Sequence, residues 1–257
     1  MSLIVGVIPA RYASQRLPGK PLVDLLGKPM VQRVYEQAKK AKLLNRVVVA
    51  TDDQRIVGVV QAFGGDVVMT SAEIKSGSDR VAAVAMMIDG DIFVNVQGDE
   101  PLIAPDMIDQ AVRVVLDDGQ AQVGTLAKKI DAVADLINPS IVKVVVAADS
   151  NALYFSRSPV PFVRDEADQA KWLERQTFFK HIGIYVFRKD FLSRFAQLPE
   201  SPLEKTERLE QLRILEHGFR IKVGITGYDS IPVDTEEDVE RVIGLLKGAE
   251  GAQRWSR

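Results

Sequence analysis

The first 120 residues alternate between short apolar runs and longer segments whose apolar residues recur every three or four positions. The runs have the length and composition of strands buried on both faces, and they cover residues 3–8, 47–50 and 92–96. The longer segments have the spacing of helices that bury one face, over residues 31–38, 56–63, 81–88 and 108–115. This alternation predicts an α/β fold with an open, mostly parallel, doubly wound sheet. Ligands of such sheets bind beyond the carboxyl ends of the strands, so the positions after Ile8, Ala50 and Val96 are the first candidates for a site.

The second half of the chain is less regular. Its predicted strands are 142–147, 152–155 and 182–187, and the first two pair across a turn at 149–151. Residues 158–176 are polar and lack periodicity, which is typical of a mobile loop or an arm that contacts a partner. Helix-start signals occur at 201–204 and at 235–238. We expect a single domain over residues 1–247 and a frayed tail over 248–257.

Composition excludes several classes of function. The chain has no cysteine and only two histidines, which rules out disulfides and a thiolate nucleophile and argues against a multi-histidine zinc site. Any metal should therefore be held mainly by carboxylates, which suits magnesium. A net charge of −2 gives no field that attracts nucleic acid or a membrane surface. The N-terminal apolar run is too short to span a membrane and has no signal-peptide start, so we expect a cytoplasmic protein.

A basic loop follows the first predicted strand. It reads PARYASQRLPGKP over residues 9–21 and carries Arg11, Arg16 and Lys20, with Gly19 allowing a close backbone approach. Cationic side chains and free backbone N–H groups at this position can bind a polyphosphate. It is not a Walker P-loop, because Pro21 stands where a Ser or Thr would contact magnesium. Charge alone favours a solvated basic loop over a phosphate-binding one.

Two acidic positions are candidates for a metal site. Asp99 follows the strand at 92–96 beside Gly98, which would admit a ligand next to the carboxylate. Asp234 immediately precedes the helix start at Thr235, and it could complete a metal site with Asp99. Local bonding of Asp99 in a turn, and an acidic helix start near Asp234, are the alternative interpretations.

Taken together, these motifs identify a family. The chain resembles the 3-deoxy-manno-octulosonate cytidylyltransferases in order from about residue 3 to residue 243, through IPARYASQRLPGKPL, SGSDR, NVQGDEP, ALYFSRSPVPF, HIGIYVF, LEQLRILEHG and VDTEEDVERV. The resemblance implies a sheet of the nucleotide-diphospho-sugar transferase type and a homodimer formed through the second half. It also implies transfer of CMP from CTP to the anomeric hydroxyl of 3-deoxy-manno-octulosonate (Kdo), with release of pyrophosphate. The product would serve lipopolysaccharide core synthesis.

The resemblance also assigns residues. The nucleotide would bind the half formed by about residues 1–120, and the sugar acid the half formed by about 121–247. Arg11 and Lys20 would hold the CTP phosphates and act in catalysis with Asp99 and Asp234, which would bind magnesium. Other nucleotide contacts would come from Ser14, Ser76, Gly77 and Gln97. The sugar acid would be surrounded by Arg80, Arg157, His181, Tyr185, Glu210 and Gln211.

Some alternatives stay open. Tyr185 also fits a core strand residue, Glu210 a solvated helix face, and His181 a packed ring. Family members often have SGTER where this chain has SGSDR at 76–80, and residues 163–176 do not align. An 8-amino Kdo analogue or another sugar acid would suit the same nucleotide site. A catalytically inactive nucleotide-binding module that regulates a partner is the non-enzyme alternative, but it would not need both carboxylates.

Overall fold

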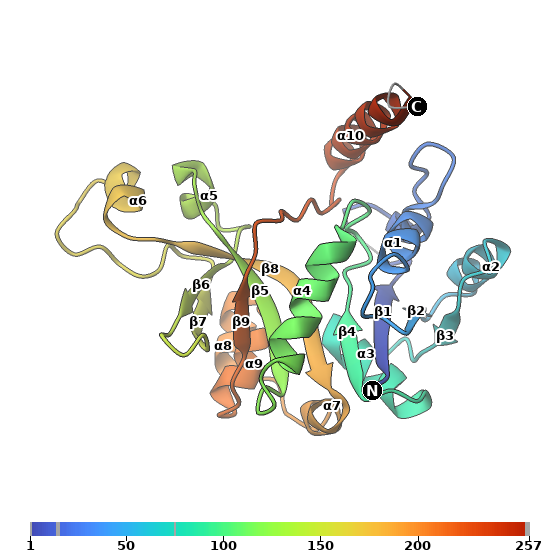
Figure 1. Cartoon of the computed structure of the whole chain (residues 1–257), viewed down its shortest axis with the longest axis horizontal. Coiled ribbons are helices and arrows are strands. Elements are labelled where there is room, and N and C mark those ends of the chain that lie inside the picture. The colour runs from blue at the N-terminus through green and yellow to red at the C-terminus, as the bar shows by residue number, and fades with distance from the viewer. Residues whose placement is uncertain (1, 14–15, 75, 255–257) are drawn as a thin grey trace.

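The computed structural model describes residues 2–13, 16–74 and 76–254. Within these residues nine strands form one sheet, with β3-β2-β1-β4-β8-β5-β9 as its main path (Figure 1). The strands are β1 (Ile4–Ala10), β2 (Arg46–Thr51), β3 (Val67–Met69), β4 (Ile92–Asn95), β5 (Val123–Lys129), β6 (Lys143–Val146), β7 (Ala152–Ser156), β8 (Phe179–Arg188) and β9 (Lys222–Ile225).

Most strands along the main path run in one direction. β1 is parallel to both β2 and β4, β2 is parallel to β3, and β5 is parallel to β9. β8 lies between β4 and β5 and is antiparallel to both. The predicted open, mostly parallel α/β sheet is therefore confirmed, with one reversed strand in its centre.

Helices cover both faces of the sheet. Alternate side chains of β1 point to opposite faces, so Ile4 and Ile8 pack under α1, α2 and α4, whereas Val5 and Val7 pack under α3, α7 and α9. Burial on both faces explains why β1 reads as a continuous apolar run. The helices are α1 (Met30–Ala38), α2 (Gln54–Ala62), α3 (Gly77–Met87), α4 (Pro105–Leu116), α5 (Val133–Ile137), α6 (Trp172–Arg175), α7 (Lys189–Phe195), α8 (Pro202–Glu207), α9 (Gln211–Glu216) and α10 (Glu236–Arg254), with short 3-10 helices η1 (Lys20–Leu22) and η2 (Gln169–Lys171).

The second half contains both expected and unexpected elements. β6 and β7 form the predicted antiparallel hairpin, and the capping box at Ser201 and Glu204 begins α8 as predicted. The irregular segment 158–176 is held at Trp172, whose buried ring packs with Ile130, Leu136 and Phe178. Figure 1 shows α5 and α6 together at the end of the molecule away from β1.

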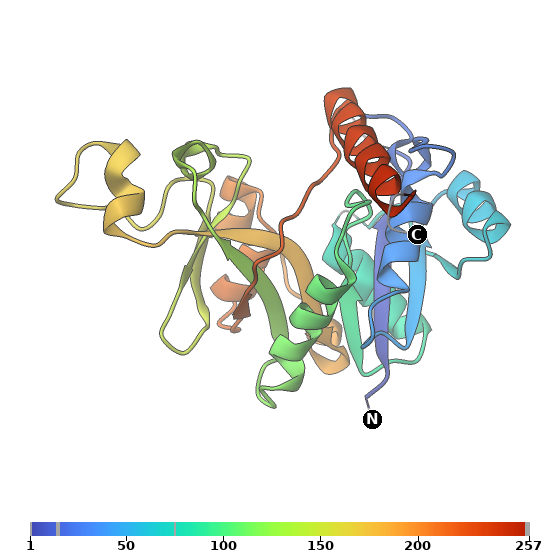
Figure 2. The ribbon, with the colours of Figure 1, turned by 45° about the horizontal axis from the view of Figure 1, so that its top comes forward.

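A connection from β9 crosses the molecule to α10, as Figure 2 shows. It ends at the predicted cap, where Thr235 Oγ1 accepts from the Asp238 backbone N–H at 3.3 Å. α10 then packs Val242 and Leu246 against Leu17 and Leu25 beside the loop that follows β1. The helix continues to Arg254, so fraying from residue 248 stays a prediction. No helix among the described residues has both the length and the apolar character that a membrane crossing requires.

Candidate active site

The loops after β1 and β4 meet where the strand order reverses. β1 pairs with β2 on one side and with β4 on the other, and all three strands end at the same edge of the sheet. Doubly wound sheets bind ligands at such a point, outside the carboxyl ends of the strands. Arg11 follows β1 there, and Gln97, Gly98 and Asp99 follow β4.

Gly98 allows these two loops to touch. A Cβ atom at this position would lie 2.4 Å from the carbonyl oxygen of Pro9, well inside van der Waals contact. Only glycine fits so close an approach without moving the backbone. Gly98 therefore fixes Asp99 beside the loop that carries Arg11 and Lys20.

The loop after β1 closes on itself at Gly19. The Gly19 N–H donates to the Tyr12 carbonyl at 3.0 Å, and Gly19 adopts φ 70°, in the left-handed region that glycine accepts without strain. The Arg55 guanidinium lies 3.2 Å from the centroid of the Tyr12 ring and covers the loop from α2. Lys20 begins η1 directly after this turn, close to the ends of β1 and β4.

Asp234 reaches the same place from the far end of the chain. The Val233 N–H donates to the Asp99 carbonyl at 2.9 Å, and the Val233 side chain is fully buried. Lys20 Nζ then lies 2.6 Å from Asp99 Oδ2 and 3.0 Å from Asp234 Oδ1. Arg16 adds a second cation 3.0 Å from Asp234 Oδ1. The two carboxylates that the sequence singled out thus converge on one cation.

The charge state of Lys20 follows from these contacts. Burial by itself would lower the pKa of Lys20, but the hydrogen bonds and charges of Asp99 and Asp234 outweigh it, and the pKa is raised. Lys20 therefore stays an ammonium ion throughout the physiological range, which suits a contact with phosphate.

A cavity of about 690 Å³ opens at this point. It brings together six of the residues assigned from the sequence: Arg11, Lys20, Gly77, Gln97, Asp99 and Asp234. Ser76 lies beside it, because its carbonyl accepts from Arg11 Nη2 at 3.4 Å. Ser14, expected near the phosphates, lies outside the described residues.

β8 places two of the expected sugar contacts next to the cavity. Gln97 Nε2, from the cavity lining, donates to the Gly183 carbonyl at 2.6 Å. Gly183 lies on β8 midway between His181 and Tyr185. The His181 ring contacts Tyr185 and lies edge-on to Phe155, and its Nε2 is 2.9 Å from Thr125 Oγ1. Burial lowers the pKa of His181 to about 3, so the ring is neutral at pH 7. Burial also raises the pKa of the Tyr185 hydroxyl, with the charge of Glu210 adding to the shift.

The remaining expected sugar contacts are spread over three places. Glu210 and Gln211 lie at the start of α9, where Glu210 Oε1 accepts from Ser78 Oγ on α3. Arg157 donates to the carbonyls of Glu207 and Pro139 at 2.7 and 3.0 Å. Arg80 is fully buried, paired with Asp52 at 3.1 Å and bonded to Thr70, and it does not line the cavity. A sugar contact from Arg80 or Arg157 would require these partners to be exchanged.

The donors present suit a magnesium ion that binds together with its substrate. Among the described residues, no group of three or more His, Cys, Asp or Glu is arranged to hold a metal. Asp99 and Asp234 nevertheless both lie within 3.0 Å of one ammonium nitrogen, so their oxygens already share a cation position. Magnesium in nucleotide sites is commonly held by one or two carboxylates, with phosphates and water completing the shell.

Sequence reasoning did not assign roles to Asp79 or Arg213. Asp79 completes the cap of α3, since the Ser76 side chain accepts its backbone N–H at 3.0 Å, and Ser-x-x-Asp is a cap signature that could have been read. Arg213 is buried on α9 and bonded to Asp79 and Glu204. Its spacing in α9 gives no sign that its partners lie on other helices.

Comparison with known proteins agrees with this geometry. The profile of the Cytidylyltransferase family matches residues 5–222. The 3-deoxy-manno-octulosonate cytidylyltransferase of Geobacter metallireducens is 52% identical over 247 residues, which is 95% of this chain and 97% of that protein. The enzyme of the same name from Geotalea uraniireducens is 52% identical over 248 residues, covering 95% of this chain and 99% of that protein. This chain belongs to the 3-deoxy-manno-octulosonate cytidylyltransferase family.

Solved structures place the fold in the same group. A CMP:2-keto-3-deoxy-manno-octonic acid synthetase complexed with CTP is 44% identical and has a TM-score of 0.90, covering 96% of this chain and 100% of that one. A cytidylyltransferase from Leptospira borgpetersenii is 19% identical with a TM-score of 0.61 over 98% of this chain and 96% of that one, which shows a shared fold alone. As a 3-deoxy-manno-octulosonate cytidylyltransferase family member, the chain is a nucleotidyltransferase, and the regulatory-module alternative is not favoured.

Proposed function

We propose that the chain transfers CMP from CTP to the anomeric hydroxyl of Kdo and releases pyrophosphate. The observation that carries the proposal is the convergence of Asp99 and Asp234 on Lys20, in the lining of a cavity that Arg11 also lines. Both carboxylates and both cations come from the sequence motifs on which the family resemblance rests. The product would be the activated sugar used in lipopolysaccharide core synthesis.

Arg11 and Lys20 would bind the phosphates of CTP. Both side chains line the cavity at the carboxyl ends of the sheet, where a triphosphate would meet two fixed positive charges. The first turn of α3, with Ser76 and Gly77, lies beside them and would contact the cytidine together with Gln97. Ser14 would complete the phosphate loop.

Asp99 and Asp234 would hold magnesium together with the phosphate oxygens of CTP. Magnesium, when bound, neutralises phosphate charge and lowers the pKa of an adjacent hydroxyl. The protein's own contribution is alignment: Gly98 and the Val233–Asp99 backbone bond fix the two carboxylates before substrate arrives.

The sugar hydroxyl would attack the α-phosphorus of CTP. An O–P bond forms to the sugar, the hydroxyl releases its proton to solvent, the bond from the α-phosphorus to the bridging oxygen breaks, and pyrophosphate leaves with that electron pair. Lys20 and Arg11 would stabilise the charge that develops on the phosphates. No protein nucleophile is required, which agrees with a chain that has no cysteine.

The sugar acid would bind between β8 and the start of α9. The expected contacts on these two elements are His181 and Tyr185 on β8, and Glu210 and Gln211 at the start of α9. A neutral His181 can either donate a hydrogen bond to a sugar hydroxyl or accept one from it, whereas a charged ring could only donate.

The homodimer expected from the resemblance is also a proposal. Leu153 and Phe162 in the second half are 62% and 74% exposed, an arrangement that a partner subunit would cover. Sedimentation of the purified chain should give the mass of two subunits, and a mass of one subunit at micromolar concentration would contradict the dimer.

The function is tested by measuring pyrophosphate release with a panel of nucleotides and sugar acids. We expect release with CTP, Kdo and magnesium together, and almost none when any one is left out. The panel should include the 8-amino analogue of Kdo, because one substituent can be distinguished by a single side chain. Rapid turnover with ATP or GTP but not with CTP would contradict the proposal and leave the fold intact.

A further inference from the structure

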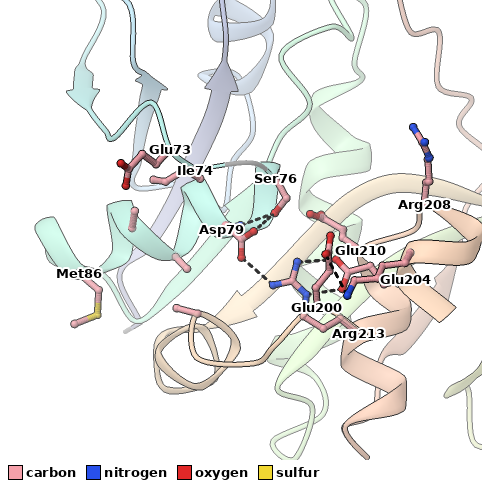
Figure 3. A pocket seen from close by; sticks show the side chains of 14 residues that line it. Glu73, Ile74, Ser76, Asp79, Met86, Glu200, Glu204, Arg208, Glu210 and Arg213 are labelled. Atoms are coloured by element: carbon pink, nitrogen blue, oxygen red, sulfur yellow. Dashed lines mark hydrogen bonds and ion pairs between the residues drawn. The ribbon is translucent and has the colours of Figure 1, made fainter. Parts of the chain in front are cut away.

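A buried ionic cluster links α3 to α8 and α9. The Arg213 guanidinium on α9 donates to both carboxylate oxygens of Glu204 on α8, through Nε at 2.9 Å and Nη2 at 2.7 Å (Figure 3). Its remaining nitrogen, Nη1, donates to Asp79 Oδ1 on α3 at 3.1 Å. Arg213 and Glu204 are 7% exposed, so this is a fixed contact and not a surface pair. One guanidinium therefore joins three helices.

On the α3 side the cluster leads to the nucleotide cavity. Asp79 Oδ2 accepts from Ser76 Oγ at 2.7 Å, and Ser76 in turn caps the first turn of α3. The Ser76 carbonyl accepts from Arg11, and Gly77 lines the cavity. A continuous series of hydrogen bonds thus runs from Arg213 through Asp79 and Ser76 to Arg11.

On the α9 side the cluster leads to the expected sugar contacts. Arg213 lies less than one turn after Glu210 and Gln211 on the same short helix. Glu210 reaches α3 independently, because it accepts from the Ser78 side chain and from the Ser78 backbone N–H at 3.4 Å. Two adjacent residues of α3, Ser78 and Asp79, are therefore bonded to α9.

Beside these contacts the two halves are separated by an opening. A cavity of about 1070 Å³ is lined by Asp79, Ala82 and Met86 on α3 and by Glu204, Lys205 and Arg213 on α8 and α9. The Asp79–Arg213 pair bridges its two walls, as Figure 3 shows. Because the cavity interrupts side-chain packing between α3 and the α8–α9 pair at this point, the distance between them depends on polar contacts such as Asp79–Arg213.

We propose that Arg213 is a positioning residue that sets the first turn of α3, and through it Ser76 and Arg11, relative to the sugar-side helix α9. The proposal rests on the cytidylyl transfer proposed above. It assigns to one side chain the task of holding the two substrate halves at a fixed separation, so that the sugar hydroxyl and the α-phosphate meet. Arginine suits the task because its planar fork makes three directed bonds at once, which the single ammonium of lysine cannot reproduce.

The sharpest variant is Asp79→Asn. It removes the charge partner of Arg213 on α3 but leaves the Arg213–Glu204 pair intact, whereas replacing Arg213 by an apolar residue would strand Glu204 as a buried charge. We expect kcat/KM to fall about tenfold, because small misplacements of reacting groups are costly. The matched control is Asp66→Asn, which breaks an exposed Arg46–Asp66 pair of 3.0 Å far from the cavity and should leave kcat/KM within twofold. Arg213→Lys is the second variant and should behave like Asp79→Asn.

A double-mutant cycle separates positioning from stability. If Asp79 acts on the nucleotide through Arg11, the loss caused by Asp79→Asn in CTP affinity and in kcat/KM should shrink at least threefold in an Arg11→Ala background. Additive losses, or an Asp79→Asn protein that melts earlier with kinetics within twofold of wild type, would overturn the proposal. CTP titration does not need the sugar, so it measures the coupling between Asp79 and Arg11 even in the absence of turnover. If the wild type releases no pyrophosphate with CTP and Kdo, that result contradicts the proposed function but not the positioning role of Arg213. Failure of the wild type to bind CTP would overturn both.

Discussion

Lys20 is the residue on which the proposed chemistry depends. Its ammonium touches both carboxylates and lies in the same cavity as Arg11. Before substrate binds, the charge of Lys20 balances the negative charges of Asp99 and Asp234. With CTP present, the same ammonium can contact phosphate.

The first prediction concerns this lysine. Lys20→Ala should lower kcat and kcat/KM together by roughly a hundredfold, about 3 kcal/mol, because its contact with phosphate strengthens as charge develops. A rise in KM with unchanged kcat would mean that Lys20 only attracts CTP. Lys28→Ala is the control, since Lys28 lies just before α1 and is likewise paired with a carboxylate, that of Glu36, at 2.7 Å. Kinetics of Lys20→Ala within twofold of wild type would refute both roles.

The second prediction concerns the carboxylates. Asp99→Asn and Asp234→Asn should each abolish turnover, because each removes a metal ligand, and should leave the melting temperature within a few degrees of wild type. Each variant keeps the other carboxylate as a partner for Lys20, so no buried charge is left unpaired. Steady-state kinetics with a magnesium titration, together with thermal unfolding, measure both effects. Early unfolding with normal specific activity would show that the residue is structural.

At the residue scale the sequence predicts the site better than it predicts individual contacts. The role of Asp99 follows from its place after a buried strand, whereas only position and family resemblance distinguish Asp234 from its acidic neighbours. What brings Asp234 to Asp99 is the Val233 backbone bond, which has no sequence signature. The burial of Arg80 is likewise not predictable, because nothing in the sequence indicates that this charged residue is fully buried beside Asp52.

Two elements meet at Gly98, and their contact gives the third prediction. Gly98→Ala would place a methyl group 2.4 Å from the Pro9 carbonyl oxygen, so the ends of β1 and β4 must separate. We expect a loss of about 1–3 kcal/mol in the free energy of unfolding and reduced activity, because Asp99 moves with its strand. Gly58→Ala is the matched control, since a Cβ there meets nothing within 4 Å on helix α2, and it should be neutral or slightly stabilising. Equal unfolding curves for wild type and Gly98→Ala would contradict the close approach.

Element prediction succeeds where a strand is apolar throughout and fails where helix packing demands glycine. The sequence predicts β1, β2 and β4 because both of their faces are buried. It does not predict β5 and β9, because each has an internal glycine that weakens the strand pattern. A Cβ at Gly124 or Gly224 would lie 2.7 or 2.6 Å, respectively, from a valine side chain of α4. Glycine at these positions therefore allows α4 to pack closely on β5 and β9. The insertion of β8 between β4 and β5 is a long-range pairing that local sequence cannot reveal.

For the whole molecule, His181 links stability to pH. Its pKa in the folded chain is lowered to about 3, whereas an unfolded chain binds the proton near pH 6.5. Above pH 6.5 His181 is neutral in both states, and its contribution to the free energy of unfolding is complete. As the pH falls from about 6.5 towards 3, the unfolded chain binds the proton and the folded chain does not, so stability is lost. By pH 5 the loss should reach about 1–2 kcal/mol.

The fourth prediction follows from this linkage. The free energy of unfolding should fall less between pH 7 and pH 5 in His181→Gln than in the wild type, by about 1–2 kcal/mol. Denaturant unfolding at both pH values measures it, and the difference between the two proteins cancels the other titrating groups. An equal fall in both proteins would show that His181 takes up its proton without cost to the fold.

The most direct test of the central claim is phosphorus-31 NMR of the purified chain with CTP, Kdo and magnesium. Transfer of CMP predicts that the triphosphate signals disappear while a pyrophosphate signal and one new phosphodiester signal grow in a 2:1 intensity ratio, because pyrophosphate carries two phosphorus atoms. Formation of free CMP with pyrophosphate would indicate hydrolysis in place of transfer. Unchanged CTP signals in the presence of all three components would contradict the account.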